Sequence, residues 1–170
     1  MKKFFLFIWE IIKIVVIALI IVIPIRMFIF QPFSVRGASM EPNFFNLDYL
    51  IVEEISYRFT QPQRGDVIIF YTPEDNSTRL IKRVVGLPGE GVKVSAGRVW
   101  IDNQLLDESD YLDEDIKTLG AVEFNLGEDQ YFVLGDNRSL SHDSRGFGPV
   151  GKDNIIGKFI FRIWSTEYFK

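Results

Sequence analysis

The 170-residue sequence contains no cysteine and only one histidine, His142. Without cysteine, the chain can form neither a disulfide framework nor a thiolate metal site. With a single imidazole and no thiol, it also lacks the ligand set of the usual zinc hydrolases. We therefore expect no metal and no cofactor.

Positive charge is scarce outside the N-terminal region. Residues 1–30 carry a net charge of +3, whereas the remainder holds 15 basic against 22 acidic residues, a net charge of −7. An acidic globular part argues against nucleic acid as a partner. The length leaves room for one domain plus an attachment, and no obligate protein partner is predicted.

One long apolar run occupies residues 11–30. A helix of about 20 residues, rising about 1.5 Å per residue, spans a hydrocarbon core of about 30 Å. The run is longer than the roughly 7–15 apolar residues of a cleavable signal, which is the alternative interpretation. Basic residues precede the run, so the positive-inside rule predicts a cytoplasmic N-terminus.

The predicted organisation is therefore an anchor followed by one domain. Residues 1–30 form the cytoplasmic N-terminus and a single transmembrane helix in the cell membrane, and the lipid bilayer is a partner. Residues 31–170 form an extracytoplasmic domain. The apolar stretch at residues 159–164 is too short for a second span and contains Arg162, so it is predicted to be a buried strand.

Beyond residue 31 the pattern predicts strands and turns, with no sustained helical period. Short β-rich runs alternate with Pro-, Gly- and Asn-containing turn formers; the runs are YLIVEE, DVIIFYT, RLIKRVVG, GVKVSA, RVWID, QYFVLG and IIGKFIFRIW. Frequent strands without intervening helices indicate a mainly β fold, an antiparallel sandwich or barrel-like domain. The acidic run at residues 107–115 predicts a solvated loop; a calcium site is the alternative, without EF-hand spacing.

The stretch GASMEP places Ser39 shortly after the apolar run. Ser39 is either a turn residue or a nucleophile. If it is a nucleophile, Gly37 permits an unusual backbone there, and backbone N–H groups around the turn could bind an oxyanion. His142 is a poor candidate base, because its neighbour Asp143 would point the opposite way in an extended chain. Lys82, within the apolar run RLIKRVV, either points to water from an edge strand or is desolvated with a lowered pKa.

Four segments together resemble the sequence boxes of bacterial type I signal peptidases. They are, in order, SMEP (residues 39–42), RGDVIIF (64–70), RLIKRVVGLPGE (79–90) and GDNRSLSHDSRGFG (135–148). The resemblance runs from the anchor to about residue 163. It implies the signal-peptidase type of β domain and a Ser–Lys endopeptidase, whose substrates are the signal peptides of exported preproteins, cut at small-x-small sites.

The resemblance also implies roles for individual residues. Ser39 is expected to be the nucleophile, Lys82 the general base, and Ser141 the residue that orients the lysine amine. Asp143 and Arg145 would form a supporting salt bridge. The remaining supporting residues, expected to shape the adjoining turn, are Asp136, Asn137 and Arg138.

Gly37 stands where some family members carry a serine whose hydroxyl helps the oxyanion, and in this it resembles Gram-positive members. The oxyanion site would then depend on the Ser39 N–H. Three further departures from the pattern affect turns: Asn43 for threonine, Leu47 for glycine and Glu90 for aspartate.

An extended peptide is expected to pair with strand edges near residues 33–36 and 80–83. The apolar residues expected near the dyad are Phe33, Val35, Phe44, Leu80 and Ile81, which form either shallow substrate pockets or ordinary core. Two rivals remain: a Ser–Lys protease of related fold that acts on another target, such as a self-cleaving repressor-type protein, and an anchored β domain that only binds a partner.

Overall fold

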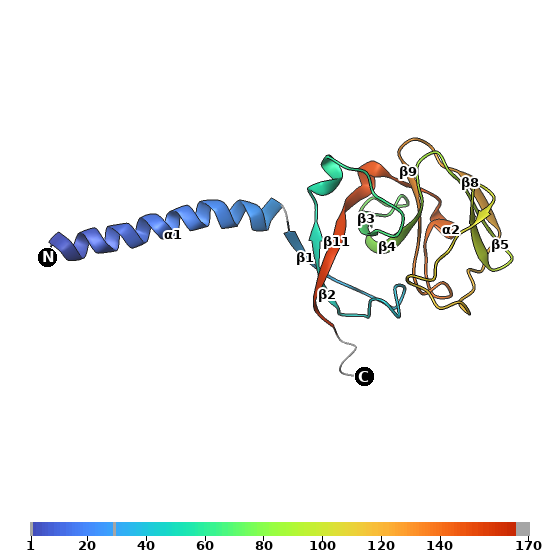
Figure 1. The fold of residues 1–170 in the computed structure, drawn as a ribbon, viewed down its shortest axis with the longest axis horizontal. Coiled ribbons are helices and arrows are strands. Elements are labelled where there is room, and N and C mark those ends of the chain that lie inside the picture. Colours follow the sequence, from blue (N-terminus) through green and yellow to red (C-terminus); the bar gives the residue numbers. More distant parts are fainter. Residues whose placement is uncertain (1, 29, 166–170) are drawn as a thin grey trace.

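A computed structural model describes residues 2–28 and 30–165, apart from the side chains of residues 2, 5 and 23–30. Helix α1 (Lys2–Phe28) projects away from a β-rich part that contains the rest of the described chain (Figure 1). Within the described residues, no helix meets the length and apolarity required of a membrane span. The far end of the expected span, from residue 23, lies outside the described side chains, so the anchor remains a prediction.

The β-rich part is built from two antiparallel sheets. One has the strand order β1-β2-β11-β3-β4-β9-β10 and the other β7-β6-β5-β8. The strands are β1 (Phe30–Ser34), β2 (Tyr49–Glu53), β3 (Val67–Tyr71), β4 (Arg79–Gly86), β5 (Gly91–Ser95), β6 (Arg98–Ile101), β7 (Gln104–Leu105), β8 (Val122–Asn125), β9 (Gln130–Leu134), β10 (Val150–Gly151) and β11 (Ile155–Trp164). The helical turns are η1 (Ser56–Arg58), α2 (Ser144–Phe147) and η2 (Lys152–Asn154). The expected mainly β, antiparallel fold is confirmed.

Each of the seven predicted runs contains a strand, and the sequence missed mainly short or irregular ones. β1 escaped prediction because Pro32 interrupts its pattern. Since proline cannot donate to a sheet ladder, it is tolerated at an edge, and β1 pairs only with β2. The edge position of β1 leaves its outer side open, which matters for the site described below.

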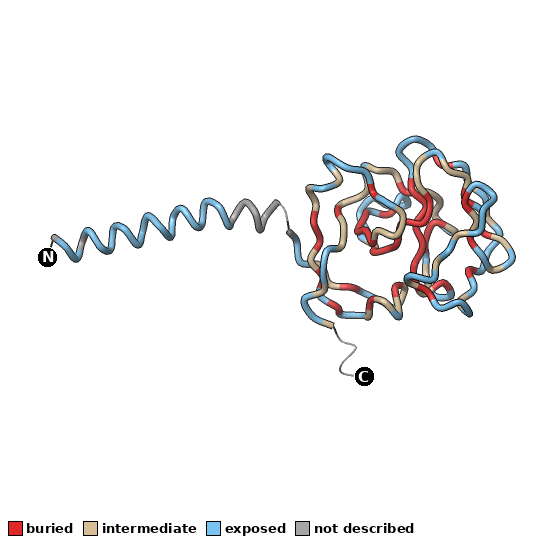
Figure 2. Tube along the Cα trace, viewed as in Figure 1, coloured by how far each residue is buried: buried red, intermediate tan, exposed pale blue. Residues whose placement is uncertain are grey.

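Buried residues gather in the interior of the β-rich part (Figure 2). Their apolar side chains form several clusters. The cluster between the two sheets contains Val85, Val92, Val94, Val99, Ile101, Leu126, Phe132 and Leu134. A second cluster, beneath the Ser39 turn, contains Val35, Met40, Phe44, Leu50, Val67 and Ile81. β4 contributes to both and is buried from Ile81 to Gly86, including the charged residues Lys82 and Arg83, which explains why its sequence does not alternate between apolar and polar residues.

Gly86 lies at the end of β4, where the two sheets meet closely. A Cβ at this position would lie 2.4 Å from Val92, 2.9 Å from Leu126 and 2.9 Å from Phe132. These three side chains belong to the cluster between the sheets, so there is no room for even one methyl group.

We therefore expect Gly86→Ala to destabilise the β-rich part by about 1–3 kcal/mol, because overpacking a dense core forces its neighbours to shift. Gly127→Ala is the matched control, since its Cβ would meet only the Gln130 side chain, at 3.4 Å or more. The measurement is denaturant unfolding of the purified full chain in detergent. Equal stability of the two variants would contradict the close packing at Gly86.

Candidate active site

Ser39 sits in a tight turn that is fixed from both sides. Gly37 has φ +87°, in the left-handed region that favours glycine, and its N–H donates to Asn46 Oδ1 at 2.9 Å. Met40, directly after Ser39, is 0% exposed and belongs to the cluster beneath the turn. The buried methionine therefore holds the backbone while the neighbouring serine is only half-buried.

Lys82 reaches this turn from the middle of β4, where it pairs with Ile68 of β3. Its side chain is 2% exposed. Its Nζ donates to Ser39 Oγ at 2.7 Å and to the Ile81 carbonyl oxygen at 2.9 Å. Of the two orientations open from the sequence, the structure has the desolvated lysine and not the one pointing to water.

Burial has a direct electrostatic consequence for this amine. Desolvation lowers the pKa of Lys82 from 10.5 to about 8, although the negative charges of Asp143 and Asp136 act in the opposite direction. At pH 7, a pKa of about 8 leaves roughly 9% of the amine neutral, against roughly 0.03% for an unperturbed lysine. A few hundred times more of this lysine is thus able to accept a proton.

The segment from Gly135 to Arg145 closes over the turn. The Asn137 N–H donates to the Ser39 carbonyl oxygen at 3.1 Å. A Cβ on Gly135 would lie 2.4 Å from that same oxygen and 2.2 Å from Ser141 Oγ, so only glycine allows this approach. Ser141 Oγ is buried, and its hydroxyl helps to lower the pKa of Asp143. The described hydrogen bonds of Lys82 Nζ do not include Ser141, so the expected orienting bond is not present in this geometry.

Asp143 and Arg145 form the expected ion pair, at 2.8 Å between Oδ1 and Nε. Burial alone would raise the pKa of Asp143, but hydrogen bonds and charge from Arg145 lower it overall. The Gly135 N–H also donates to its Oδ2, at 3.1 Å. Arg145 in turn donates to the carbonyl oxygens of Leu119 and Arg138, so the pair ties the turn to neighbouring loops.

Asp136 has a partner that the sequence analysis missed. The guanidinium of Arg83 binds it in a bidentate manner, with Nε–Oδ1 at 2.8 Å and Nη2–Oδ2 at 2.6 Å. Asn43 adds a bond to Oδ2 at 2.9 Å and another to the Tyr111 carbonyl oxygen at 2.7 Å. The sequence did contain a signal for this pair: an arginine between apolar residues of a predicted strand needs a carboxylate partner if it is buried.

Arg138 corrects one expectation about the acidic run at residues 107–115. It is 2% exposed and pairs with Glu108 at 2.5 Å, while also donating to Thr118 Oγ1 and the Gly135 carbonyl oxygen. Leu112 is buried as well. The run is therefore not simply a solvated loop, because part of it neutralises a buried cation beside the site.

The single histidine is not in contact with Ser39. His142 Nε2 lies 3.1 Å from Glu74 Oε2, and the ring is largely exposed and packs edge-on against Phe147. The role of base is thus open to Lys82. Among the described residues, no group of three or more histidine, cysteine, aspartate or glutamate side chains is arranged to hold a metal ion.

Ser39 and Lys82 open into a cleft of about 500 Å³ between β1 and β4. Its walls are formed by Pro32, Phe33, Ser34, Arg36, Thr78, Arg79, Leu80 and Ile81. Of the expected pocket residues, Phe33, Leu80 and Ile81 therefore line the cleft. Val35 and Phe44 do not, because both are buried in the cluster beneath the turn.

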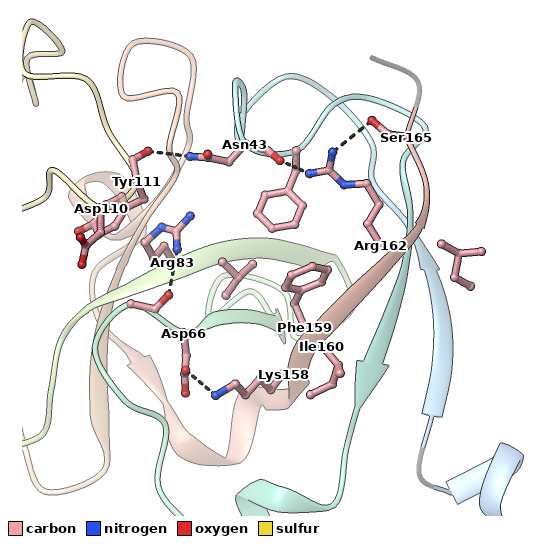
Figure 3. A pocket seen from close by; sticks show the side chains of 14 residues that line it. Asn43, Asp66, Arg83, Asp110, Tyr111, Lys158, Phe159, Ile160, Arg162 and Ser165 are labelled. Atoms are coloured by element: carbon pink, nitrogen blue, oxygen red, sulfur yellow. Dashed lines mark hydrogen bonds and ion pairs between the residues drawn. The ribbon is translucent and has the colours of Figure 1, made fainter. Parts of the chain in front are cut away.

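A larger cavity of about 780 Å³ includes neither Ser39 nor Lys82 (Figure 3). Arg83, Tyr111, Lys158 and Arg162 surround it, and the Arg83 guanidinium lies 4.2 Å from the centre of the Tyr111 ring. Its charged groups already have partners: Lys158 pairs with Asp66 at 2.7 Å and Arg162 with Asp48 at 3.3 Å. The contact between Ser39 and Lys82 therefore lies outside the larger of the two cavities.

Comparison with known proteins places this geometry in a family. The model of the family described as "Signal peptidase, peptidase S26" matches residues 8–164. The chain belongs to this family. The resemblance to type I signal peptidases is thereby confirmed, and the chain is a serine peptidase of that type.

Similar curated proteins cover nearly the whole chain. A probable signal peptidase I-1 from Synechocystis is 39% identical over 95% of this chain and 85% of its own length. Signal peptidase I P from Bacillus subtilis subsp. natto is 35% identical over 86% of this chain and 83% of its own. A crystal structure of a signal peptidase I from Enterococcus faecalis, 31% identical, superposes with a TM-score of 0.50 over 59% of this chain and 98% of that one.

Replacing the buried amine should make the fold more stable. The folded pKa of Lys82 lies below its unfolded value, so the unfolded state binds more protons between pH 8 and 10.5 and stability rises with pH in that window. At pH 7 the protonated amine costs folding free energy that an apolar side chain of similar length does not. We expect Lys82→Met to be about 1–3 kcal/mol more stable than wild type at pH 7.

This gain should shrink as the pH approaches 10.5, where the lysine is neutral in both states. The measurement is chemical unfolding of the full chain in detergent at pH 7, 8.5 and 10, with Lys152→Met, at a half-exposed position, as the control. A gain that does not depend on pH would contradict the lowered pKa.

Proposed function

We propose that this chain is a membrane-bound endopeptidase that removes signal peptides from exported preproteins at small-x-small sites, with Ser39 as nucleophile and Lys82 as general base. The observation that carries the proposal is the 2.7 Å contact between Lys82 Nζ and Ser39 Oγ inside a buried environment. A hydroxyl becomes a useful nucleophile when an adjacent base can take its proton.

The proposed reaction proceeds in two stages. Neutral Lys82 takes the Ser39 proton as Oγ attacks the scissile carbonyl carbon, and the resulting ammonium returns that proton to the departing amine. The carbon–nitrogen bond breaks, leaving an ester between Ser39 and the signal peptide. Lys82 then takes a proton from an attacking water, and it returns this proton to Ser39 Oγ as the ester is hydrolysed.

The oxyanion formed in each stage needs donors that are free to point at it. Among the described residues, the Ser39 N–H donates to no carbonyl or side chain, which leaves it free for that purpose. Gly37 has no side chain and so offers no hydroxyl as a second donor to the oxyanion. We propose the Ser39 N–H as the backbone donor, worth the roughly 100–1,000-fold in rate that a single oxyanion donor typically contributes.

The proposed substrate lies as an extended strand in the cleft. The outer edge of β1 is unpaired, and β9 pairs with β4 only from Arg83 onward, so the β4 edge from Arg79 to Lys82 also faces the cleft. Main-chain hydrogen bonds to these edges give affinity without sequence preference. The side chains of Phe33, Leu80 and Ile81 narrow the cleft beside the dyad, which favours small substrate residues there.

The test is cleavage of a labelled preprotein by the full chain in detergent. We expect Ser39→Ala and Lys82→Met to lose at least about 1,000-fold in kcat/KM, because each removes a member of a unit that acts together. His142→Ala should stay within about twofold of wild type, because its ring contacts Glu74 and Phe147 and not the serine.

The pH profile adds a second readout. The base must be neutral, so kcat/KM should rise with pH and reach half its maximum near pH 8, the folded pKa of Lys82. A rise centred well below pH 8 that disappears in His142→Ala would refute the lysine as base. Failure of the wild-type chain to cut any preprotein would favour the anchored binding domain instead.

We further propose that α1 anchors the chain in the cell membrane as a single span, with its N-terminus inside and residues 31–170 on the extracytoplasmic side. α1 is 27 residues long, which corresponds to about 40 Å of helix. Its described side chains from Leu6 to Val22 are exposed, and all except Glu10 and Lys13 are uncharged. Such a surface requires an apolar surrounding.

The absence of native cysteine makes this topology easy to map with single cysteine substitutions. We expect Ser77→Cys, on an exposed turn of the β-rich part, to react with a membrane-impermeant maleimide in intact cells. Lys3→Cys should react only after lysis. Labelling of both positions in intact cells, or of neither, would contradict the proposed orientation.

A further inference from the structure

The cleft beside the dyad is positively charged within an acidic domain. Residues 31–170 carry a net charge of −7, yet the cleft walls include Arg36 and Arg79 and no aspartate or glutamate. One arginine comes from each wall, directly after β1 and at the start of β4. This local reversal of charge is a property of the site, not of the overall composition.

These two arginines differ from most others in the described chain by having no carboxylate bound to them. Arg64, Arg83, Arg138, Arg145 and Arg162 each form an ion pair. The side chains of Arg36 and Arg79 form no ion pair or hydrogen bond with a described residue; the Arg79 guanidinium lies 5.8 Å from the Phe33 ring centre and influences Glu54 at longer range. Both side chains are exposed, and both residues line the cleft, so their guanidinium donors are accessible to a charged group there.

The nearest acidic turn does not neutralise Arg79. Asp75, in the connection between β3 and β4, accepts hydrogen bonds from Thr72 Oγ1, Ser77 N–H, Thr78 N–H and Thr78 Oγ1 at 2.6–2.9 Å. Its carboxylate is committed to holding that turn. Asp75 therefore forms no described ion pair with Arg79.

Each of the two arginines precedes one member of the dyad by three residues. Arg79 is three residues before Lys82 on β4, which corresponds to about 10 Å along a strand, and Arg36 is three residues before Ser39. A peptide paired with the β4 edge would have its residue opposite Arg79 about three residues from the scissile bond. A side chain within about four residues of that bond can thus reach a guanidinium.

We propose that Arg36 and Arg79 make the cleft selective for substrates that carry an aspartate or glutamate within about four residues of the scissile bond, and that they disfavour lysine or arginine there. This rests on the proposed function of the same site. Guanidinium and carboxylate match each other in shape and charge, whereas a like charge at the same place is repelled. Because both arginines are exposed, each contributes modestly, and the preference falls with salt.

The test uses a peptide series with one small-x-small site. Aspartate, asparagine or lysine is placed in turn at each of the four positions on either side of the scissile bond, and kcat/KM is measured with the full chain in neutral detergent. At one or more positions we expect wild type to prefer aspartate over lysine by about three- to tenfold at low salt, and less at 0.5 M salt. Arg36→Gln and Arg79→Gln should each weaken the preference and the double variant should abolish it, while Arg79→Glu should reverse it at its own position.

The controls separate this proposal from the function on which it rests. All variants should still cleave the asparagine peptides, because the dyad is intact; loss of cleavage by wild type itself would refute the proposed function instead. Arg98→Gln is the matched control, an exposed arginine without a described ion pair on β6 of the other sheet. Equal cleavage of aspartate and lysine peptides by wild type, or a preference that survives in the double variant, would overturn the proposal. The proposal would also be overturned if the arginine substitutions changed kcat/KM only when the assay is run on anionic lipid vesicles and by the same factor for every peptide charge.

Discussion

The contact between Lys82 and Ser39 requires an amine that is almost completely buried, and the surrounding structure is arranged to tolerate this. A buried amine is costly in its charged form, so its environment must be rigid enough that the side chain cannot escape to solvent. β4 provides this rigidity because it pairs with β3 as far as Arg83 and with β9 from Arg83 onward, and because it packs into three apolar clusters. Met40 fixes the opposite partner, and Gly135 allows the third segment to approach the serine backbone. The contact between Ser39 and Lys82 is therefore held by packing more than by its own hydrogen bond.

The charged groups around Lys82 also affect its pKa. Two carboxylates, Asp136 and Asp143, lie close enough to raise the pKa of the amine. Each is bound by an arginine, Arg83 or Arg145, in contacts of 2.6–2.9 Å. Desolvation outweighs the effect of both carboxylates, so the pKa of Lys82 falls. The two ion pairs hold together the loops around the lysine.

Much of this arrangement could be predicted from the sequence, and the reasons for the gaps are physical. Long apolar runs and turn formers predicted the central strands, because burial on both faces leaves a strong local signal. β1 was missed since Pro32 obscures an edge strand, and β10 since two residues carry no pattern. The partners of Asp136 and Arg138 could not be read from the sequence either. They depend on which buried groups meet across sequence separations of 53 and 30 residues, and only the folded chain decides that.

The departures from the family pattern illustrate the same point at single residues. Leu47 adopts φ +70°, a conformation that usually needs glycine, so the turn keeps the glycine-like backbone even without the glycine. Asn43 uses its amide to bridge Asp136 and the Tyr111 carbonyl, two bonds that a single hydroxyl proton could not both supply. A substitution therefore preserved the geometry in one case and added a contact in the other.

The connection between α1 and β1 links the proposed anchor to the chemistry. α1 ends at Phe28 and β1 begins at Phe30, so the strand that forms one wall of the cleft starts almost where the helix stops. Phe33 lines the cleft five residues after the helix, a distance of at most about 18 Å even for a fully extended chain. If α1 spans the bilayer as proposed, the open edge of β1 must lie within that distance of its surface. An extended peptide leaving the membrane would then meet the strand edges before its mature part could fold, which is the condition under which main-chain recognition can work.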